Sequence, residues 1–261
     1  MILGMGTVML LAGSTQTQQT ASIAGLEEGA EKTLIDDLVI ADHILAEQGV
    51  LDAFGHVSAR HPKNPQRFLM SRSLAPALVK AEDVLEYDLD GNAVDPKGRT
   101  SFLERFVHSQ IYRTRPDVNA IVHSHAPAVI AFGTTQTPPR PITLVAAFLP
   151  QRVPIFEIRR VAGMTNMLVL SPHLGRALAE TLGANSVALM RGHGMVVAAS
   201  SVALAVYTLV DARLETDAIS LGGPLTFLEP QEAESADKML DQIHLRAWEL
   251  CKREAEAHLC K

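Results

Sequence analysis

The sequence has few cysteines, few aromatic side chains and no excess of positive charge. Its 261 residues include two cysteines, Cys251 and Cys260, both near the C-terminal end. Two thiols placed in this way fit neither a disulfide framework nor a cysteine zinc site. The formal net charge is -6, aromatic residues make up 5% of the chain, and the sequence contains no basic stripe with interleaved aromatics. We therefore expect neither a disulfide-stabilised fold nor a nucleic-acid partner.

The sequence also lacks an apolar run of about 20 residues, the length needed to span a bilayer. The apolar residues 1–13 and the small polar residues 14–22 are together similar to the later parts of a secretory signal, but the basic start is missing. They are either part of a longer signal or a disordered extension. We expect no membrane partner, and a cytoplasmic location unless a truncated signal directs the protein to the periplasm or out of the cell.

The rest of the composition, with 47% hydrophobic and 20% charged residues, is that of a globular chain that can bury one sizeable core. We expect residues 1–30 to be an extension and residues 31–261 to form a single domain with C-terminal helices. Short strands interleaved with helices predict a layered α/β domain. Periodicity and turn residues predict helices over 31–50, 101–114, from 126, 171–182, 203–221 and 233–259, and strands over 55–60, 67–71, 84–89, 121–125, 142–147, 153–158, 186–190 and 195–199.

Three histidines are placed where strands are expected to end. His123 and His125 follow an apolar lead-in, and on a strand both imidazoles point to the same face because side chains alternate. His193 follows the apolar run 186–190 in a glycine turn. Three neutral imidazoles can hold Zn, Mn, Fe or Co and leave coordination positions open for substrate. A His-x-His pair taken alone is more often a surface or core pair than a pair of metal ligands.

An acidic residue just upstream has two interpretations. Ser101-x-x-Glu104 is typical of a capping box, in which the carboxylate bonds back to the first amide of a helix. Glu104 and His108 also lie one helical turn apart and share a face, which favours a role for Glu104 in a site.

The order and spacing of these residues resemble the class II aldolase/adducin family. The similarity runs from about Leu34 to Leu221 and rests on Glu104-x-x-x-His108, Arg115-Pro116-Asp117, His123-x-His125 and Gly192-His193-Gly194. It implies a three-layer α/β/α fold with a central, mainly antiparallel sheet. It also implies a homo-oligomer, expected to be a homotetramer.

The resemblance further implies the roles of the site residues. His123, His125 and His193 match the family's metal ligands, so the implied cofactor is a divalent metal ion, either Mn, Zn, Fe or Co. Glu104 matches the residue that serves as acid and base. This role requires a raised pKa, which we expect for a carboxyl beside Phe102 and Phe106 in a partly apolar pocket.

The loops expected around the substrate differ from those of the family's sugar-phosphate aldolases. Phe102 and Leu103 precede Glu104, and two apolar side chains cannot replace hydroxyl donors to a phosphate. Arg72 offers a planar fork for a carboxylate, and His56 offers a second donor or a proton carrier. Three serines are weaker candidates for substrate binding, since serines in such loops usually bond to backbone: Ser58, Ser71 and Ser73.

These loops are similar to the family's decarboxylase-like branch, of the 3-hydroxy-2-methylpyridine-4,5-dicarboxylate and dihydroxyphthalate decarboxylase type. The sequence therefore predicts a metal-dependent carbon-carbon lyase, first of all a decarboxylase of a hydroxylated aromatic or heteroaromatic carboxylate. One alternative is an aldehyde-lyase that cleaves a non-phosphorylated hydroxy-carbonyl compound. A non-catalytic, adducin-like interaction module and a metal-dependent oxygenase are further alternatives.

Overall fold

The computed structural model describes residues 14–135, 139–220 and 225–259, so the apolar segment 1–13 lies outside the described residues. The strands form one sheet in the order β3-β2-β1-β4-β7-β6-β5, and every neighbouring pair is antiparallel except β5 and β6. The prediction of a mainly antiparallel sheet is confirmed. The bounds are β1 (His56–Arg60), β2 (Arg67–Ser71), β3 (Val84–Asp88), β4 (Ala120–Ser124), β5 (Ile155–Phe156), β6 (Val187–Met190) and β7 (Gly194–Ala199).

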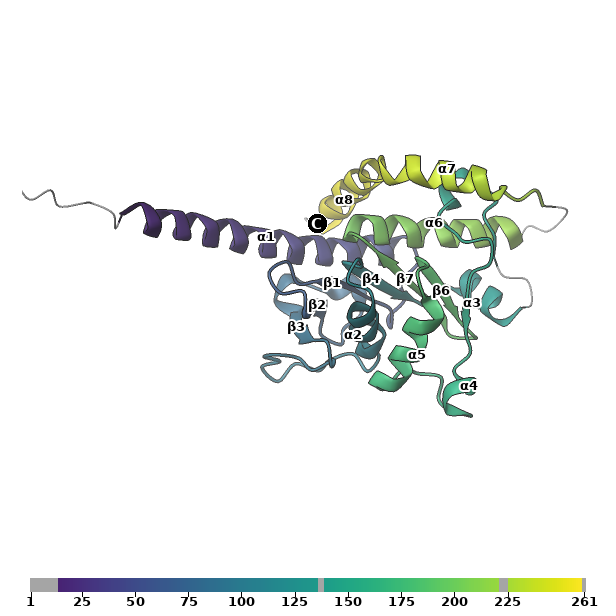
Figure 1. The fold of residues 1–261 in the computed structure, drawn as a ribbon, viewed down its shortest axis with the longest axis horizontal. Coiled ribbons are helices and arrows are strands. Elements are labelled where there is room, and N and C mark those ends of the chain that lie inside the picture. The colour runs from purple at the N-terminus through teal and green to yellow at the C-terminus, as the bar shows by residue number, and fades with distance from the viewer. Residues whose placement is uncertain (1–13, 136–138, 221–224, 260–261) are drawn as a thin grey trace, which may run out of the picture.

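Helices cover both faces of the sheet, which gives the predicted three layers (Figure 1). Helices α1, α6 and α8 lie on one side, and α2 and α5 lie on the other. None of the helices in the described part of the chain is long and apolar enough to cross a membrane. The bounds are α1 (Ser14–Glu47), α2 (Arg105–Thr114), α3 (Pro127–Thr134), α4 (Arg159–Ala162), α5 (Pro172–Leu182), α6 (Val202–Ser220), α7 (Pro230–Asp241) and α8 (Leu245–Leu259), with short 3-10 turns η1 (Pro76–Leu78), η2 (Ala81–Asp83) and η3 (Leu144–Ala146).

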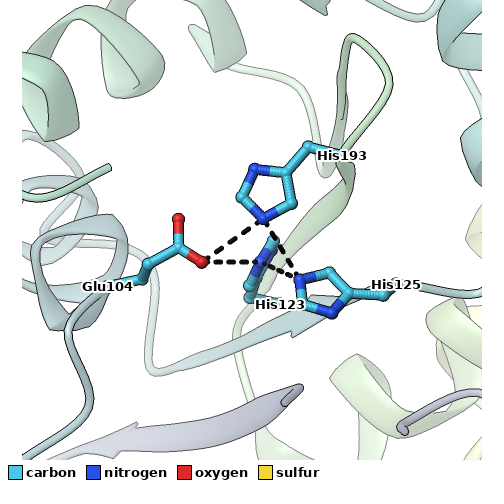
Figure 2. A group of neighbouring side chains, drawn as sticks. All are labelled: Glu104, His123, His125 and His193. Carbon is cyan, nitrogen blue, oxygen red and sulfur yellow. Dashed lines mark hydrogen bonds and ion pairs between the residues drawn. The ribbon is translucent and has the colours of Figure 1, made fainter. Parts of the chain in front are cut away.

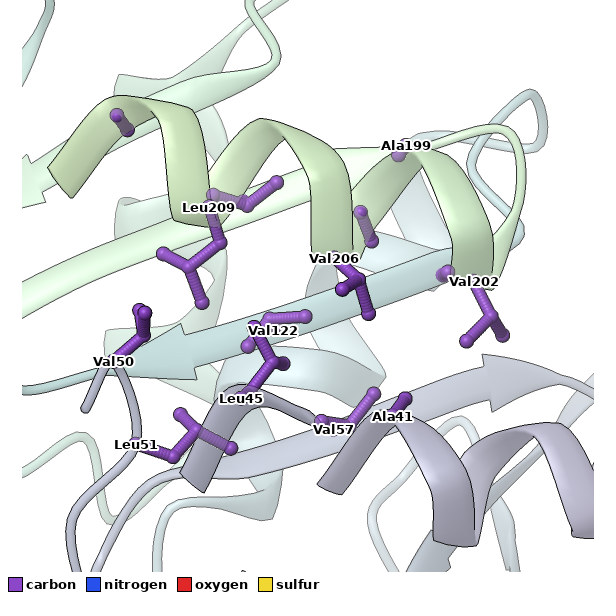
Figure 3. Close-up of a cluster of buried hydrophobic side chains, with 14 of the residues drawn as sticks. Ala41, Leu45, Val50, Leu51, Val57, Val122, Ala199, Val202, Val206 and Leu209 are labelled. Carbon is purple, nitrogen blue, oxygen red and sulfur yellow. The ribbon is translucent and has the colours of Figure 1, made fainter. Parts of the chain in front are cut away.

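Alternation along β4 divides its side chains between two hydrophobic clusters. Ala120 and Val122 pack in the cluster that α1 and α6 cover, and Figure 3 shows Val122 between Leu45 of α1 and Val206 of α6. Ile121 belongs to the cluster under α2 and α5. A fully buried Val or Leu stabilises the fold by about 1.5–3 kcal/mol. Side chains alternate between the two faces of a strand. His123 lies two residues after Ile121, so it faces the same side, toward α2.

Two predicted elements in the second half of the chain are wrong. Residues 142–147 contain the helical turn η3 rather than a strand, with Leu144 exposed and Ala146 buried. A short apolar run fits either a strand or a helical turn. Here one side of the segment is buried and the other is exposed, which favours the helical turn. The predicted helix 233–259 is divided between α7 and α8. The chain turns at Gln242–His244, and this turn lets Trp248 pack into the cluster under α1 and α6.

Helix α1 begins earlier than predicted. Its first residue is Ser14, so part of the segment expected to lie outside the fold continues the helix, which projects from the body of the molecule (Figure 1). The predicted stop is confirmed, because α1 ends at Glu47 and Gly49 adopts a left-handed conformation with φ of 65°.

Candidate active site

Three imidazoles and one carboxylate point toward one another at the end of β4 (Figure 2). We call His123, His125 and His193 the histidine cluster. The Nε2 atom of His125 lies 3.0 Å from Nε2 of His123 and 3.1 Å from Nε2 of His193. Oε2 of Glu104 lies 3.3 Å from Nε2 of His193 and 3.7 Å from Nε2 of His123. Residues from the cap of α2, from β4 and its end, and from the turn between β6 and β7 therefore meet at one point.

Each imidazole of the histidine cluster is held through its other ring nitrogen. The Nδ1 atoms of His123, His125 and His193 lie 3.0 Å from the Met195 carbonyl, 3.4 Å from an Asp52 carboxylate oxygen and 3.1 Å from the Met167 carbonyl, respectively. Because these partners are acceptors, each Nδ1 carries a proton and each Nε2 is the ring nitrogen that faces the other members of the cluster. This arrangement is how proteins orient histidines that ligate a metal.

The spacing of the Nε2 atoms fits one divalent cation. Two nitrogen ligands at about 2.1 Å from an ion and at right angles lie about 3.0 Å apart, which matches the separations within the histidine cluster. Glu104 adds an oxygen donor beside them. The donor set of imidazole and carboxylate suits Zn, Mn, Fe and Co. The residues present therefore fit the metal that the sequence predicted.

Pairing between strands brings the histidine cluster together. His123 is opposite His56 in the antiparallel pair of β1 and β4, and Met195 of β7 is opposite Ser124. His193 lies in the tight turn between β6 and β7. The residue after it must be glycine, because a Cβ at Gly194 would overlap the Ser124 carbonyl oxygen. This close approach lets the turn place His193 next to His125.

Glu104 is held by a contact that differs from the predicted one. The capping box of Ser101 and Glu104 is wrong, because α2 begins at Arg105 and Glu104 occupies the cap position without a side-chain cap bond. Instead, Oε1 of Glu104 accepts a hydrogen bond of 2.8 Å from the Val169 amide. Its other oxygen, Oε2, is directed toward the histidine cluster (Figure 2).

The prediction of a raised pKa for Glu104 is also wrong. Burial alone would raise the pKa of this carboxyl, but hydrogen bonds and charge interactions with His123 and His193 outweigh burial and hold the pKa below its usual range. Burial also lowers the pKa of His125, to about 4, together with the neighbouring imidazoles. At neutral pH the site therefore contains an ionised Glu104 beside a neutral His125.

A cavity of about 620 Å³ opens beside the metal-fitting residues. Its polar lining consists of His56, Ser73, Glu104, His125, Asn166 and His193. Apolar residues make up most of the rest, including Phe54, Phe102 and Leu103. Among the described residues that line it, none is a lysine or an arginine. The cavity therefore offers a ligand mostly apolar walls beside the residues that can hold a metal.

His56 lines this cavity and is the first member of a buried hydrogen-bonded chain. Its Nδ1 lies 2.6 Å from Nε2 of His108, and Nδ1 of His108 lies 2.6 Å from Oγ of Ser58. Oγ of Ser58 lies 2.9 Å from the Tyr112 hydroxyl. Ser58, predicted to contact substrate, is thus fully buried inside this chain and is not a lining residue. His108 of α2 was expected to share a helix face with Glu104, but Glu104 lies just before the helix, and His108 hydrogen-bonds to His56 and Ser58 instead.

The structure separates the other predicted substrate ligands. Ser73 lines the cavity, whereas Ser71 is buried and does not. Arg72 does not line the cavity either, and its Nε donates to Oδ1 of Asp83 at 2.6 Å. The fork predicted for a substrate carboxylate is therefore turned toward an aspartate of η2.

Asp52 and Met167, which hold His125 and His193, were not predicted. Asp52 accepts hydrogen bonds from the amides of Phe54 and Gly55, which fix its carboxylate beside His125. Met167 adopts a left-handed conformation with φ of 69°, rare for a residue with a side chain, and directs its carbonyl to His193. The spacing Asp52-x-x-Gly55 indicates a turn, but no pattern around Met167 indicates its conformation.

Comparison with known proteins agrees with this geometry. Residues 36–213 match the model of a protein family, which is described as the Class II Aldolase and Adducin N-terminal domain. The chain belongs to this family. It is 34% identical to Decarboxylase tropJ of Talaromyces stipitatus over 241 residues, which cover 82% of this chain and 91% of that protein. It is 33% identical to a 3,4-dihydroxyphthalate decarboxylase of Arthrobacter keyseri over 207 residues, which cover 72% of this chain and 79% of that protein.

A solved class II aldolase shares the fold. The structure of L-fuculose 1-phosphate aldolase from Glaciozyma antarctica PI12 superposes with a TM-score of 0.75, covering 89% of this chain and 92% of that chain at 22% identity. Class II aldolases depend on a metal, and the histidine cluster with Glu104 can bind one. The family's aldolases and decarboxylases together support a lyase.

Proposed function

We propose that this member of the class II aldolase and adducin family is a divalent-metal-dependent decarboxylase of a hydroxylated aromatic or heteroaromatic carboxylate. The observation that carries the proposal is a mostly apolar cavity whose described lining includes Glu104, His125 and His193 but no lysine or arginine. Phe102 and Leu103 offer a phosphate no donor, but they can pack against an aromatic ring. The two decarboxylases similar over most of the chain support this choice.

The ionised Glu104 can accept a proton from the substrate, although its lowered pKa makes it a weaker base than the raised pKa expected from the sequence would give. Glu104 accepts the proton of the substrate hydroxyl, which increases the electron density of the ring. A divalent ion held by the histidine cluster would supply positive charge to stabilise the negative oxygen. As carbon dioxide leaves, the electron pair of the broken bond stays on the ring carbon. Glu104 then returns its proton to that carbon, and a solvent proton restores the hydroxyl.

We also propose that residues 31–261 act as one domain and that four chains assemble. Phe54 and Leu103, at 69% and 63% exposed, present large apolar side chains at the cavity. Exposed apolar side chains grouped in this way favour coverage by a ligand or another subunit. Light scattering coupled to size-exclusion chromatography tests the assembly, and a monomer would contradict it.

The function is tested by carbon dioxide release from a panel of hydroxylated aromatic carboxylates after the protein has been loaded in turn with Mn, Zn, Fe or Co. We expect release only from acids that carry a hydroxyl near the carboxylate, and we expect the same rate under nitrogen. The matched control is the same ring without the hydroxyl. Aldehyde formation from a non-phosphorylated hydroxy-carbonyl compound, with no carbon dioxide release from any acid, would favour the aldehyde-lyase. Oxygen-dependent turnover would favour an oxygenase.

A further inference from the structure

A second group of histidines lies beside the metal-fitting site and has no place in the mechanism above. His56 and Ser58 of β1 meet His108 and Tyr112 of α2 in one hydrogen-bonded chain. All four side chains are at most 1% exposed. Only His56 lines the cavity. The chain therefore connects the cavity wall to the interior of the protein.

Which atom donates in each hydrogen bond of this chain follows from Tyr112, the residue at its buried end. The only acceptor for the Tyr112 hydroxyl among the described residues is Oγ of Ser58, so Tyr112 donates to Ser58. The single proton of Ser58 is then free to go to Nδ1 of His108.

A neutral imidazole has one donor and one acceptor nitrogen. With Nδ1 of His108 accepting from Ser58, its Nε2 carries the proton and donates to Nδ1 of His56. The proton of His56 must therefore be on Nε2. This nitrogen has no protein partner among the described residues, and His56 lines the cavity, so the N–H is available to a ligand.

We propose that Tyr112, Ser58 and His108 lock His56 in the tautomer protonated on Nε2, so that His56 donates a hydrogen bond to the carboxylate of the bound substrate. His56 contacts substrate, and the other three are positioning residues. The identity of the substrate rests on the proposed function, whereas the tautomer does not. Since the described lining contains no lysine or arginine, a fixed N–H of His56 is one of the neutral donors, beside Ser73 and Asn166, that the cavity offers an anion.

The chain holds protons in place rather than conducting them. Burial raises the pKa of Tyr112, and hydrogen bonding and charge only partly offset this effect, so the phenol stays protonated at neutral pH. Burial lowers the pKa of His108 to about 3, with a further contribution from His123, so its ring stays neutral. No proton therefore leaves through the closed end. Proton transfer is left to Glu104, and His56 acts as a donor that does not need to ionise.

The tautomer can be read directly by nitrogen NMR of zinc-loaded protein labelled only at the histidine rings. His56→Gln identifies the signal of His56. We expect a protonated Nε2 and an unprotonated Nδ1 for His56, and the same pattern for His108. A His56 protonated on Nδ1 would overturn the proposal, because the chain would then run in the opposite direction.

Two substitutions of His108 separate tautomer control from packing. The amide of His108→Gln can donate to His56 and accept from Ser58, whereas His108→Leu can do neither. With 2-hydroxybenzoate as the probe, we expect calorimetric affinity to fall about 10–100-fold in His108→Leu, the value of a hydrogen bond to a charged group. His108→Gln should recover most of this loss and keep the His56 signal.

Equal affinities in these two variants, at similar melting temperatures, would contradict a positioning role for His108. Tyr112→Phe, which keeps the ring but removes the donor, should give a mixture of His56 tautomers, and an unchanged single tautomer would remove Tyr112 from the proposal. If His56 shows the expected tautomer but no hydroxylated aromatic acid loses carbon dioxide, the proposed function fails and this inference stands. If a hydroxylated aromatic acid loses carbon dioxide but His56 shows the other tautomer, the proposed function stands and this inference fails.

Discussion

Two buried carboxyl groups, one beside the cavity and one in helix α1, have pKa values that are shifted in opposite directions. Glu104, at the cavity, has partners for both oxygens, and its pKa is held below the usual range although burial opposes this. Asp42 of α1 is 1% exposed, its Oδ1 has no hydrogen-bond partner among the described residues, and burial raises its pKa well above the usual value. Burial alone does not set the charge of an acid. The partners that the fold supplies decide it.

The strongest test of the paired acid is Glu104→Gln. The amide keeps the shape of the side chain but cannot take a proton from substrate. We expect kcat to fall by about 10²–10⁴-fold, the usual contribution of a general acid or base, while the histidine cluster keeps its metal. Stopped-flow or steady-state carbon dioxide release measures the rate, and elemental analysis measures the metal. A variant with near-normal kcat would remove Glu104 from the mechanism.

The two regions also differ in how tightly a glycine is packed. Gly194→Ala would force a methyl group against the Ser124 carbonyl, and we expect a loss of about 1–3 kcal/mol in the free energy of unfolding together with weaker metal binding. The matched control is Gly29→Ala in α1, where no atom lies within 4 Å of the added carbon. There we expect a gain of about 0.5–1 kcal/mol, because alanine favours a helix. Urea unfolding measures both, and changes of the same sign would contradict this account.

Asp52→Asn tests whether the carboxylate that contacts Nδ1 of His125 contributes to metal affinity. Loss of the carboxylate weakens the partner that orients His125, and such changes lower metal affinity about 10–100-fold. Competition with a chelator of known affinity measures the change. The control is Asp90→Asn, since Asp90 is an exposed acid that pairs with Arg113 and does not line the cavity. An equal effect of the two substitutions would point to net charge rather than to orientation.

Asp42→Asn should change the pH dependence of stability. Because the folded pKa of Asp42 is raised, the folded state keeps a proton that the unfolded state releases above about pH 4, so wild-type stability falls as pH rises toward the folded pKa. The slope for one such group is about 1.4 kcal/mol per pH unit. We therefore expect the unfolding free energy of Asp42→Asn, relative to wild type, to increase between pH 5 and 8. A constant difference would show that Asp42 does not titrate on unfolding.

Local periodicity was enough to predict much of the site. Alternation along the predicted strand and the glycine turn before β7 led us to expect His123, His125 and His193 near one another, and Nε2 of His125 lies 3.0 Å from that of His123 and 3.1 Å from that of His193. The helix end before Arg115 and the α5 start at Ser171 were also predicted, since proline and a capping serine act over a few residues. Features of this kind depend on neighbours in the sequence, which a pattern can contain.

Features that depend on distant partners were not predicted. Glu104 was expected to cap α2 and to have a raised pKa, but Val169 and the histidine cluster, which decide both properties, come from elsewhere in the chain. Arg72 was expected to bind substrate, and its pairing with Asp83 depends on how η2 packs beside β2. The orienting carbonyl of Met167 depends on a backbone conformation that no residue type in this stretch indicates.

The most direct test of the central claim is the metal content of protein purified without chelator, measured beside His125→Ala. The account predicts about one divalent ion per wild-type chain, as three imidazoles around one ion require, and almost none in the variant. It also predicts that removing the ion stops carbon dioxide release and that adding it back restores the rate. A wild-type protein that stays empty after exposure to Mn, Zn, Fe and Co, or that releases carbon dioxide at full rate without metal, would contradict it.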